Sequence, residues 1–118
     1  MHDLMVGRLA EGVDAKVHRV LVDRLWPRGI SKAVAPWDSW LKEVAPSHDL
    51  RKWYGHDPDR YHEFRERYWR ELTENPSVAE LLSLWSTQGV MLLTASKSLE
   101  LSQVPILRDF LIQLSANP

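Results

Sequence analysis

Cysteine is absent from the 118 residues of this chain, and glycine is scarce, with only five. Without cysteine there is no disulfide, no thiolate nucleophile and no zinc site built on sulfur. The cysteine-dependent phosphatases, arsenate reductases and sulfurtransferases are therefore excluded, although small α/β domains often belong to these classes. A chain without cysteine fits the cytoplasm, where we expect this protein to be.

Long apolar runs are also missing. No run approaches the ~18 apolar residues that a membrane-spanning helix needs, so we expect no membrane partner. The first residues, MHDLMVGRLAEG, lack a basic segment followed by an apolar one, and we expect no signal peptide.

The chain has almost no net charge, with a formal value of −1 at pH 7, so nucleic acid is not expected as a partner. The charge is nevertheless uneven along the sequence. Between positions 16 and 32 only Asp23 opposes a group of basic residues: Lys16, Arg19, Arg24, Arg28 and Lys32. No pattern fixes an oligomeric state, and none indicates a cofactor.

The order of apolar segments predicts the fold. A chain of this length folds on one core, so we expect a single domain over residues 1–118. Apolar runs predict strands at Leu4–Leu9, Arg19–Asp23 and Val90–Leu93. Caps and helical spacing predict helices over Pro36–Val44, His48–Tyr54, Asp57–Asn75 and Ser77–Gly89, and a last helix from Val104. Strands separated by helices indicate an α/β domain whose short, mostly parallel sheet is flanked by helices in three layers.

The most informative stretch is VHRVLVDRLWPRGISK, Val17–Lys32, where an apolar strand runs into a loop rich in arginine and tryptophan. In open α/β sheets, ligands bind outside the carboxyl ends of the strands. This rule brings the loops Asp23–Gly29 and Thr94–Lys97 side by side. Guanidinium groups bind phosphate or carboxylate through paired hydrogen bonds, so we expect an anion site here. Its expected ligand-binding residues are Arg24, Trp26, Arg28, Lys32 and Lys97.

Each of these residues also has a structural interpretation. Arg24 would instead pair with Asp23 or another acid and hold the loop, and Arg28 would be an ordinary surface residue. Trp26 would stack on a ligand, or it would pack against the protein as Trp40 and Trp53 are expected to do in the core.

Two residues are candidates for proton transfer. Asp23 ends a strand, where a general base or a loop-fixing acceptor is typical. His56 precedes a helix in a tight turn, where it would act as an acid or base or would simply fix the turn. The other histidines show no metal-ligand spacing, so no metal site is predicted.

The segments VLVDRLWPRGISK, WLKEVAPS and LRKWYGHDPDRYHEF closely resemble the YeaO-like proteins, a bacterial group of domains of unknown function. The resemblance covers most of the chain and is tight from Val20 to Tyr68. It implies a small cytosolic α/β protein and carries no activity with it.

The resemblance weakens after the last predicted strand. Members of the family usually have AAKD there, followed by an acid and a His-Asn pair before the final helix. This chain keeps Lys97 but has Ser98 in place of the acid, and Ser102 and Gln103 in place of the pair. If that segment completes a site in relatives, the site is altered or lost in this chain.

We therefore carry two functional hypotheses, and whether the protein is an enzyme stays open. The first is a binder of a small anionic ligand, phosphorylated or nucleotide-like, with hydrolysis or group transfer as an extension. The alternative is a non-catalytic module that contacts a protein or nucleic acid through a surface of tryptophan and arginine.

Overall fold

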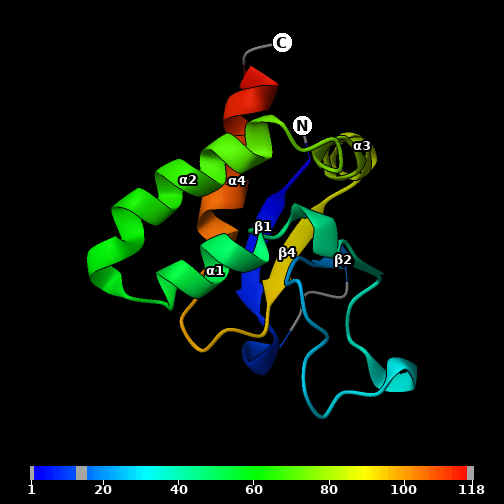
Figure 1. Ribbon diagram of the computed structural model, residues 1–118. Helices are drawn as coiled ribbons and strands as arrows, with labels where there is room; N and C mark the ends of the chain where they lie inside the picture. Colours follow the sequence, from blue (N-terminus) through cyan, green and yellow to red (C-terminus); the bar gives the residue numbers. More distant parts are fainter. Residues whose placement is uncertain (1, 13–15, 117–118) are drawn as a thin grey trace.

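The computed structural model describes residues 2–12 and 16–116. Its centre is a four-stranded sheet (Figure 1) made of β1 (Leu4–Arg8), β2 (His18–Leu21), β3 (Ser39–Trp40) and β4 (Val90–Thr94). The strand order is β1-β4-β2-β3, and every neighbouring pair is parallel. The expected α/β class with a parallel sheet is confirmed.

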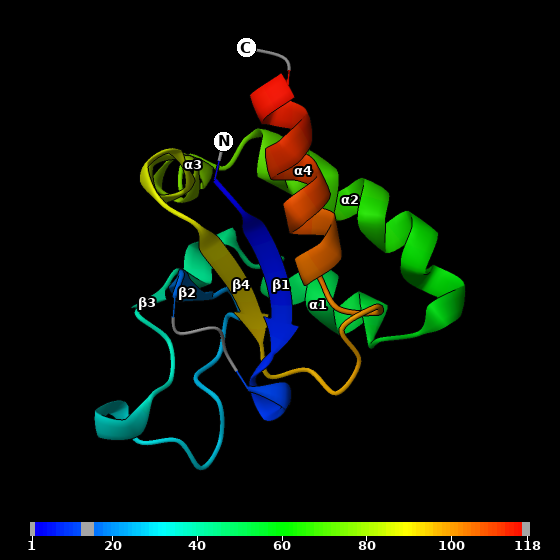
Figure 2. The same cartoon turned by 180° about the vertical axis from the view of Figure 1, so that it is seen from behind.

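The helices pack on this sheet. They are α1 (His48–Tyr54), α2 (Tyr61–Thr73), α3 (Val78–Thr87) and α4 (Val104–Ala116). Short 3₁₀ turns lie at Leu9–Glu11, Lys32–Val34, Lys42–Val44 and Pro58–Arg60. Seen from behind in Figure 2, β1 lies in front of α1, so α1 covers one face of the sheet, while α4 lies beside β1 and in front of α2.

Strand β4 is buried along its whole length, with β1 and β2 paired to its two edges. Its sequence is a continuous apolar run closed by Thr94, the pattern of a strand covered on both faces. Val90 and Leu92 join the main core beneath the helices, whereas Met91 and Leu93 are buried outside that cluster.

One face of α2 supplies much of the main core. Phe64, Tyr68 and Leu72 recur at four-residue spacing and are all buried. Phe64 stacks on Tyr54 of α1, with ring centroids 3.9 Å apart and an interplanar angle of 10°. The buried Tyr68 hydroxyl donates to the Val44 carbonyl at 2.6 Å. Burial raises the pKa of Tyr68 well above its ordinary value, so the phenol stays a donor.

The ends of the short helix α1 follow the expected chemistry. The Ser47 hydroxyl accepts a hydrogen bond from the Leu50 N–H at 3.2 Å and caps the helix. Gly55 ends the helix in the left-handed region with φ of 53°. Asp57 caps a 3₁₀ turn, and α2 begins after that turn.

The prediction of a helix over Pro36–Val44 is wrong. Edge strand β3 lies there instead, followed by a 3₁₀ turn. The Asp38 N–H donates to the Arg19 carbonyl at 2.8 Å, and the Leu41 N–H donates to the Leu21 carbonyl at 3.0 Å. Pairing with β2 therefore overrides the helical spacing of the apolar residues in this segment.

A side-chain pair holds β3 against β2. The Nε and Nη2 atoms of Arg19 donate to the Asp38 carboxylate at 3.0 and 2.9 Å, and the Arg19 N–H adds a bond of 2.9 Å. The hydrogen bonds from the Arg19 side chain and backbone hold the pKa of Asp38 below its ordinary value. The pair therefore stabilises the edge of the sheet as long as Asp38 is ionised.

This pair makes stability depend on pH. The contribution of Asp38 is fully present above its ordinary pKa of 3.8 and is lost as the pH falls below that value through the lower pKa of the folded state. We expect Asp38→Asn to be less stable than wild type at neutral pH and to lose less stability between about pH 5 and pH 2. Urea denaturation at each pH measures both effects.

Asp3→Asn is the matched control, because Asp3 is exposed and its carboxylate has no partner among the described residues. It should keep the wild-type profile. Identical acid profiles for wild type and Asp38→Asn would contradict this account.

Candidate functional site

The carboxyl ends of β2 and β4 are joined through the side chain of Asp23. Its Oδ1 accepts from the Thr94 hydroxyl at 2.7 Å and from the Gln103 amide at 2.9 Å. Its Oδ2 accepts from the Ala95 N–H at 2.8 Å. Gln103 also donates to the Val22 carbonyl at 3.1 Å, so the start of α4 is tied to the same point. Asp23 thus connects two strand ends and a helix.

Arg24 is held by the backbone of a distant segment. Its Nε donates to the Pro46 carbonyl and its Nη2 to the Ala45 carbonyl, both at 3.0 Å. Its Nη1 lies 3.9 Å from the Glu43 carboxylate, which is a loose ion pair at an exposed position. Arg24 therefore fixes the loop after β2 against the residues that precede α1.

Trp26 lies in a cluster of tryptophans. Its ring meets Trp37 and Trp40 edge to face, with centroids 4.9 and 5.3 Å away. Its Nε1 donates to the Ile30 carbonyl, and Trp40 Nε1 donates to the Asp23 carbonyl at 2.7 Å. Trp26 and Trp40 are half-buried. The cluster braces the loop that carries Arg28.

A cavity of about 300 Å³ opens between the loop after β2, the loop after β4 and the end of α1. It brings together Asp23, Arg24, Trp26, Arg28 and His56, five of the seven residues that the sequence singled out. Lys32 and Lys97 are exposed and do not line it. The remaining lining residues are Leu25, Pro27, Ala45, Pro46, Arg51, Tyr54, Phe64, Thr94, Ala95, Ser96 and Gln103.

Arg51 of α1 is the lining residue that sequence reasoning missed. The motif Arg51-Lys52-Trp53 carried part of the family resemblance, but it had no assigned role. The available signal was its position in the last turn of a short helix closed by Gly55, five residues before the cavity residue His56. Arg51 thereby adds a third arginine to the cavity lining.

The cavity carries an excess of positive charge. Among the described residues its lining has three arginines and one carboxylate, that of Asp23, which accepts hydrogen bonds from the chain itself. Arg28 and Arg51 are exposed, and neither guanidinium has a hydrogen bond or ion pair to another residue within 2–12 and 16–116. Two arginine side chains are therefore free to bind an anion.

His56 lies in the left-handed region with φ of 55°, directly after Gly55 with φ of 53°. For a non-glycine residue this conformation costs on the order of 1–2 kcal/mol of free energy, although histidine adopts it more often than most residues do. The His56 ring lies 5.6 Å from the ring of Tyr54, centroid to centroid. The turn brings the imidazole to the cavity that Arg51 also lines.

Tyr54 does not supply a free acid or base at the cavity. Its hydroxyl donates to the Leu101 carbonyl at 2.7 Å. Burial, with Tyr61 and Asp57 nearby, raises the pKa of Tyr54 to about 12. The phenol therefore stays protonated at neutral pH and contributes its ring to the cavity wall.

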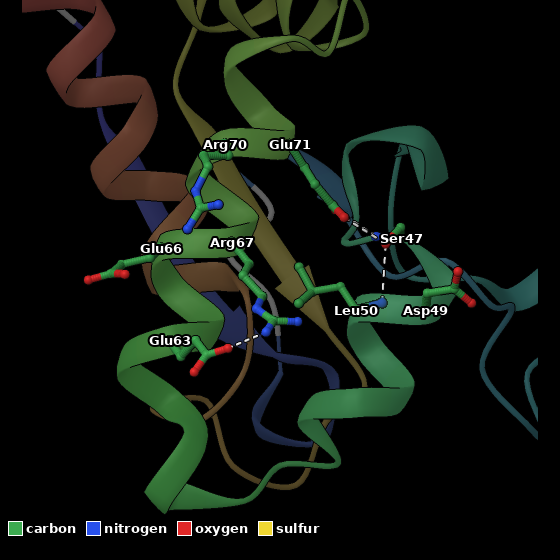
Figure 3. A pocket seen from close by; sticks show the side chains of 8 residues that line it. All are labelled: Ser47, Asp49, Leu50, Glu63, Glu66, Arg67, Arg70 and Glu71. Carbon is green, nitrogen blue, oxygen red and sulfur yellow. Dashed lines mark hydrogen bonds and ion pairs between the residues drawn. The ribbon is translucent and has the colours of Figure 1, made fainter.

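Figure 3 shows a larger hollow, of about 690 Å³, between α1 and α2. Glu71 accepts from the Ser47 N–H at 2.8 Å and from its hydroxyl at 2.6 Å, and Arg67 pairs with Glu63. Four carboxylates outnumber two arginines among its lining residues, which are Ser47, Asp49, Leu50, Glu63, Glu66, Arg67, Arg70 and Glu71. This hollow does not suit an anion, and we assign it no ligand.

Within residues 2–12 and 16–116, no three histidine or acidic side chains come together in a way that could hold a metal ion. In the same part of the chain, no helix is long and apolar enough to span a membrane.

Residues 4–117 match the family model DUF488-N3i, which is described as "Inactive DUF488-N3 subclade". This chain belongs to the DUF488 family. The YeaO-like resemblance is confirmed by uncharacterized protein YeaO of Escherichia coli, 38% identical over 98 residues that span 82% of this chain and 85% of the relative. Uncharacterized protein Rv3073c of Mycobacterium tuberculosis is 41% identical over 107 residues, spanning 90% of this chain and 91% of the relative. No solved structure matches the chain significantly.

In the loop after β4, Ser102 and Gln103 stand in place of the His-Asn pair that family members usually have. The structure gives the replacements local roles. Ser102 donates to the Leu99 carbonyl at 2.7 Å and accepts from the Val104 N–H at 3.2 Å, while Gln103 binds Asp23. At these two positions the chain uses its polar side chains to hold its own loop and the start of α4.

Asp23→Asn tests the structural role of this carboxylate. The asparagine side chain has an NH₂ group where aspartate has one of its two oxygens. That NH₂ group would face either the Ala95 N–H or the Thr94 and Gln103 donors, and a hydrogen bond would be lost. We expect a loss of about 1–3 kcal/mol in the free energy of unfolding without any ligand, measured by urea denaturation. Glu100→Gln, at an exposed position of the same loop, should change stability by less than about 0.5 kcal/mol. An unchanged midpoint for Asp23→Asn would show that the network contributes little.

Proposed function

We propose that this protein binds a small anionic ligand, carrying a phosphate or carboxylate group, in the cavity at the carboxyl ends of β2 and β4. The observation that carries the proposal is that the guanidinium groups of Arg28 and Arg51 have no hydrogen bond or ion pair to another described residue, at a cavity whose one carboxylate among those residues already accepts hydrogen bonds. A free guanidinium binds an oxyanion through two parallel hydrogen bonds.

The size and walls of the cavity support a small ligand. Its volume of about 300 Å³ lies at the lower end of the range for small-molecule sites. Pro27, Pro46, Tyr54 and Phe64 supply apolar surface beside the arginines. A ligand that carries an anionic group on a compact body, such as a sugar phosphate, matches this combination.

Binding without a reaction is the form of the proposal that the contacts favour. Asp23 uses three of the about four acceptor sites of its carboxylate on Thr94, Ala95 and Gln103, so its place in the loop network already accounts for this residue. His56 is the other candidate for proton transfer. Hydrolysis or group transfer stays an extension of the hypothesis, and the family description "inactive" weighs against it.

The alternative function, a non-catalytic interaction module, is favoured by a separate observation. Leu25 and Val34 are large apolar residues exposed at 61% and 70%, and both lie on the long segment that carries the tryptophan cluster. Exposed apolar residues beside tryptophan and arginine are typical of protein interfaces. On this hypothesis a partner would cover the segment between β2 and β3. The cytoplasmic location expected from the sequence belongs to both hypotheses and stays a prediction.

A thermal-shift experiment tests the anion site. We expect phosphate, sulfate or a sugar phosphate, at fixed ionic strength, to raise the melting temperature of the wild type. A ligand at 100 times its Kd stabilises by about 2.7 kcal/mol, which corresponds to several degrees in a domain of this size. The double variant Arg28→Ala/Arg51→Ala should lose the shift while keeping the melting temperature of the unliganded protein, because neither side chain has a partner within the described residues.

The matched control is Lys32→Ala/Arg70→Ala, which removes the same charge from exposed positions outside the cavity. It should keep the ligand-induced shift. The absence of a shift with every anion would contradict the proposal and favour the interaction module. An equal loss in both double variants would reduce the effect to general charge attraction.

A further inference from the structure

A second depression adjoins the proposed anion site. It measures about 500 Å³ and is lined by His48, Arg51, Lys52, Gly55 and His56. Arg51 and His56 line both this depression and the inner cavity beside Asp23, so the two hollows meet at these side chains. The positive lining of the inner cavity therefore continues outward along the last turn of α1.

The charge of the outer depression is one-sided. No carboxylate of residues 2–12 or 16–116 lines it, whereas the permanent cations Arg51 and Lys52 do, with two histidines beside them. The hollow between α1 and α2 offers a contrast, since four carboxylates line it. The acidic residue of α1, Asp49, lines that hollow and not the outer depression. Helix α1 thus lies between the hollow with mixed charges and the basic outer depression.

The basic side chains here are not used by the fold. Neither Arg51 nor Lys52 has a side-chain hydrogen bond, ion pair or cation–π contact with another residue among those described. Three nearby arginines are engaged by the chain: Arg60 and Arg67 lie over the ring of Trp53 at 5.3 and 4.3 Å, and Arg65 pairs with Asp109. Arg51 therefore shares the inner cavity with Arg28 and the outer depression with Lys52, and an anionic group could bind in each.

We infer that the ligand carries two anionic groups, as in a sugar bisphosphate, with one group bound at Arg28 and Arg51 and the other at Arg51 and Lys52. This inference rests on the proposed anion site and specifies its ligand. Arg51 suits the central position because a guanidinium has five N–H donors and contacts two acceptor groups at once. The apolar residues of the inner cavity then face the part of the ligand between or beside its charged groups.

The test compares two ligands that differ by one phosphate, fructose 6-phosphate and fructose 1,6-bisphosphate, by titration calorimetry at fixed ionic strength. We expect the bisphosphate to bind the wild type at least about tenfold more tightly, the ratio that corresponds to 1.4 kcal/mol. Lys52→Ala should bring this ratio close to one. Lys32→Ala, which removes an exposed lysine that lines neither hollow, should leave the ratio as in the wild type.

The outcomes separate this inference from the proposed function. If both ligands bind with equal affinity, or if the ratio survives in Lys52→Ala, the second anionic group has no place at Lys52 and the inference is wrong, while the anion site stands. An equal fall of the ratio in Lys32→Ala and Lys52→Ala would overturn the inference as well, because the preference would then reflect overall charge. If neither ligand binds and the thermal-shift screen with phosphate and sulfate is also negative, the proposed function fails and the inference fails with it.

Discussion

The carboxylate of Asp23 accepts the hydrogen bonds on which the carboxyl edge of the sheet depends. Its oxygens accept hydrogen bonds from Thr94 at the end of β4, from the Ala95 backbone and from Gln103 before α4. Its backbone carbonyl accepts from Trp40 of β3. Three strands and a helix thus meet at one residue. The cavity exists because this residue fixes the relative positions of the loops that surround it.

Much of the fold could be predicted from the sequence because its signals are local. The apolar run of β4 and the Ser47 and Gly55 ends of α1 depend on neighbouring residues, and the structure agrees with them. The prediction of a helix over Pro36–Val44 failed because the competing hydrogen bonds come from residues far away in the sequence. Arg19, on another strand, supplies the carbonyl and the guanidinium that Asp38 binds. A spacing pattern within one segment contains no information about such a partner.

The candidate site was likewise predictable where its signals are local and not where they depend on distant residues. The sequence located the edge of the sheet and the loop after β2, but it could not separate arginines that bind the chain from arginines that are free. Arg24 donates to carbonyls of Ala45 and Pro46, which lie far along the chain, whereas Arg28 has no such partner among the described residues. Arg51 reaches the cavity from α1 only through the packing of that helix on the sheet. These distinctions require the tertiary structure.

The hydrogen bonds of Gln103 and the exposed arginines of the cavity set the physical conditions for the proposed anion site. Gln103 uses its amide on Asp23 and on the Val22 carbonyl, which stabilises the loop and occupies the carboxylate. Arg28 and Arg51 remain exposed, so water and salt screen their charges, with a Debye length of about 8 Å at physiological ionic strength. A chain with a net charge of −1 has no strong long-range attraction for anions. Affinity for an anion must therefore come from direct, paired hydrogen bonds in the cavity, and this requirement makes the geometry held by Asp23 and Arg24 decisive for binding even though both residues mainly contact their own chain.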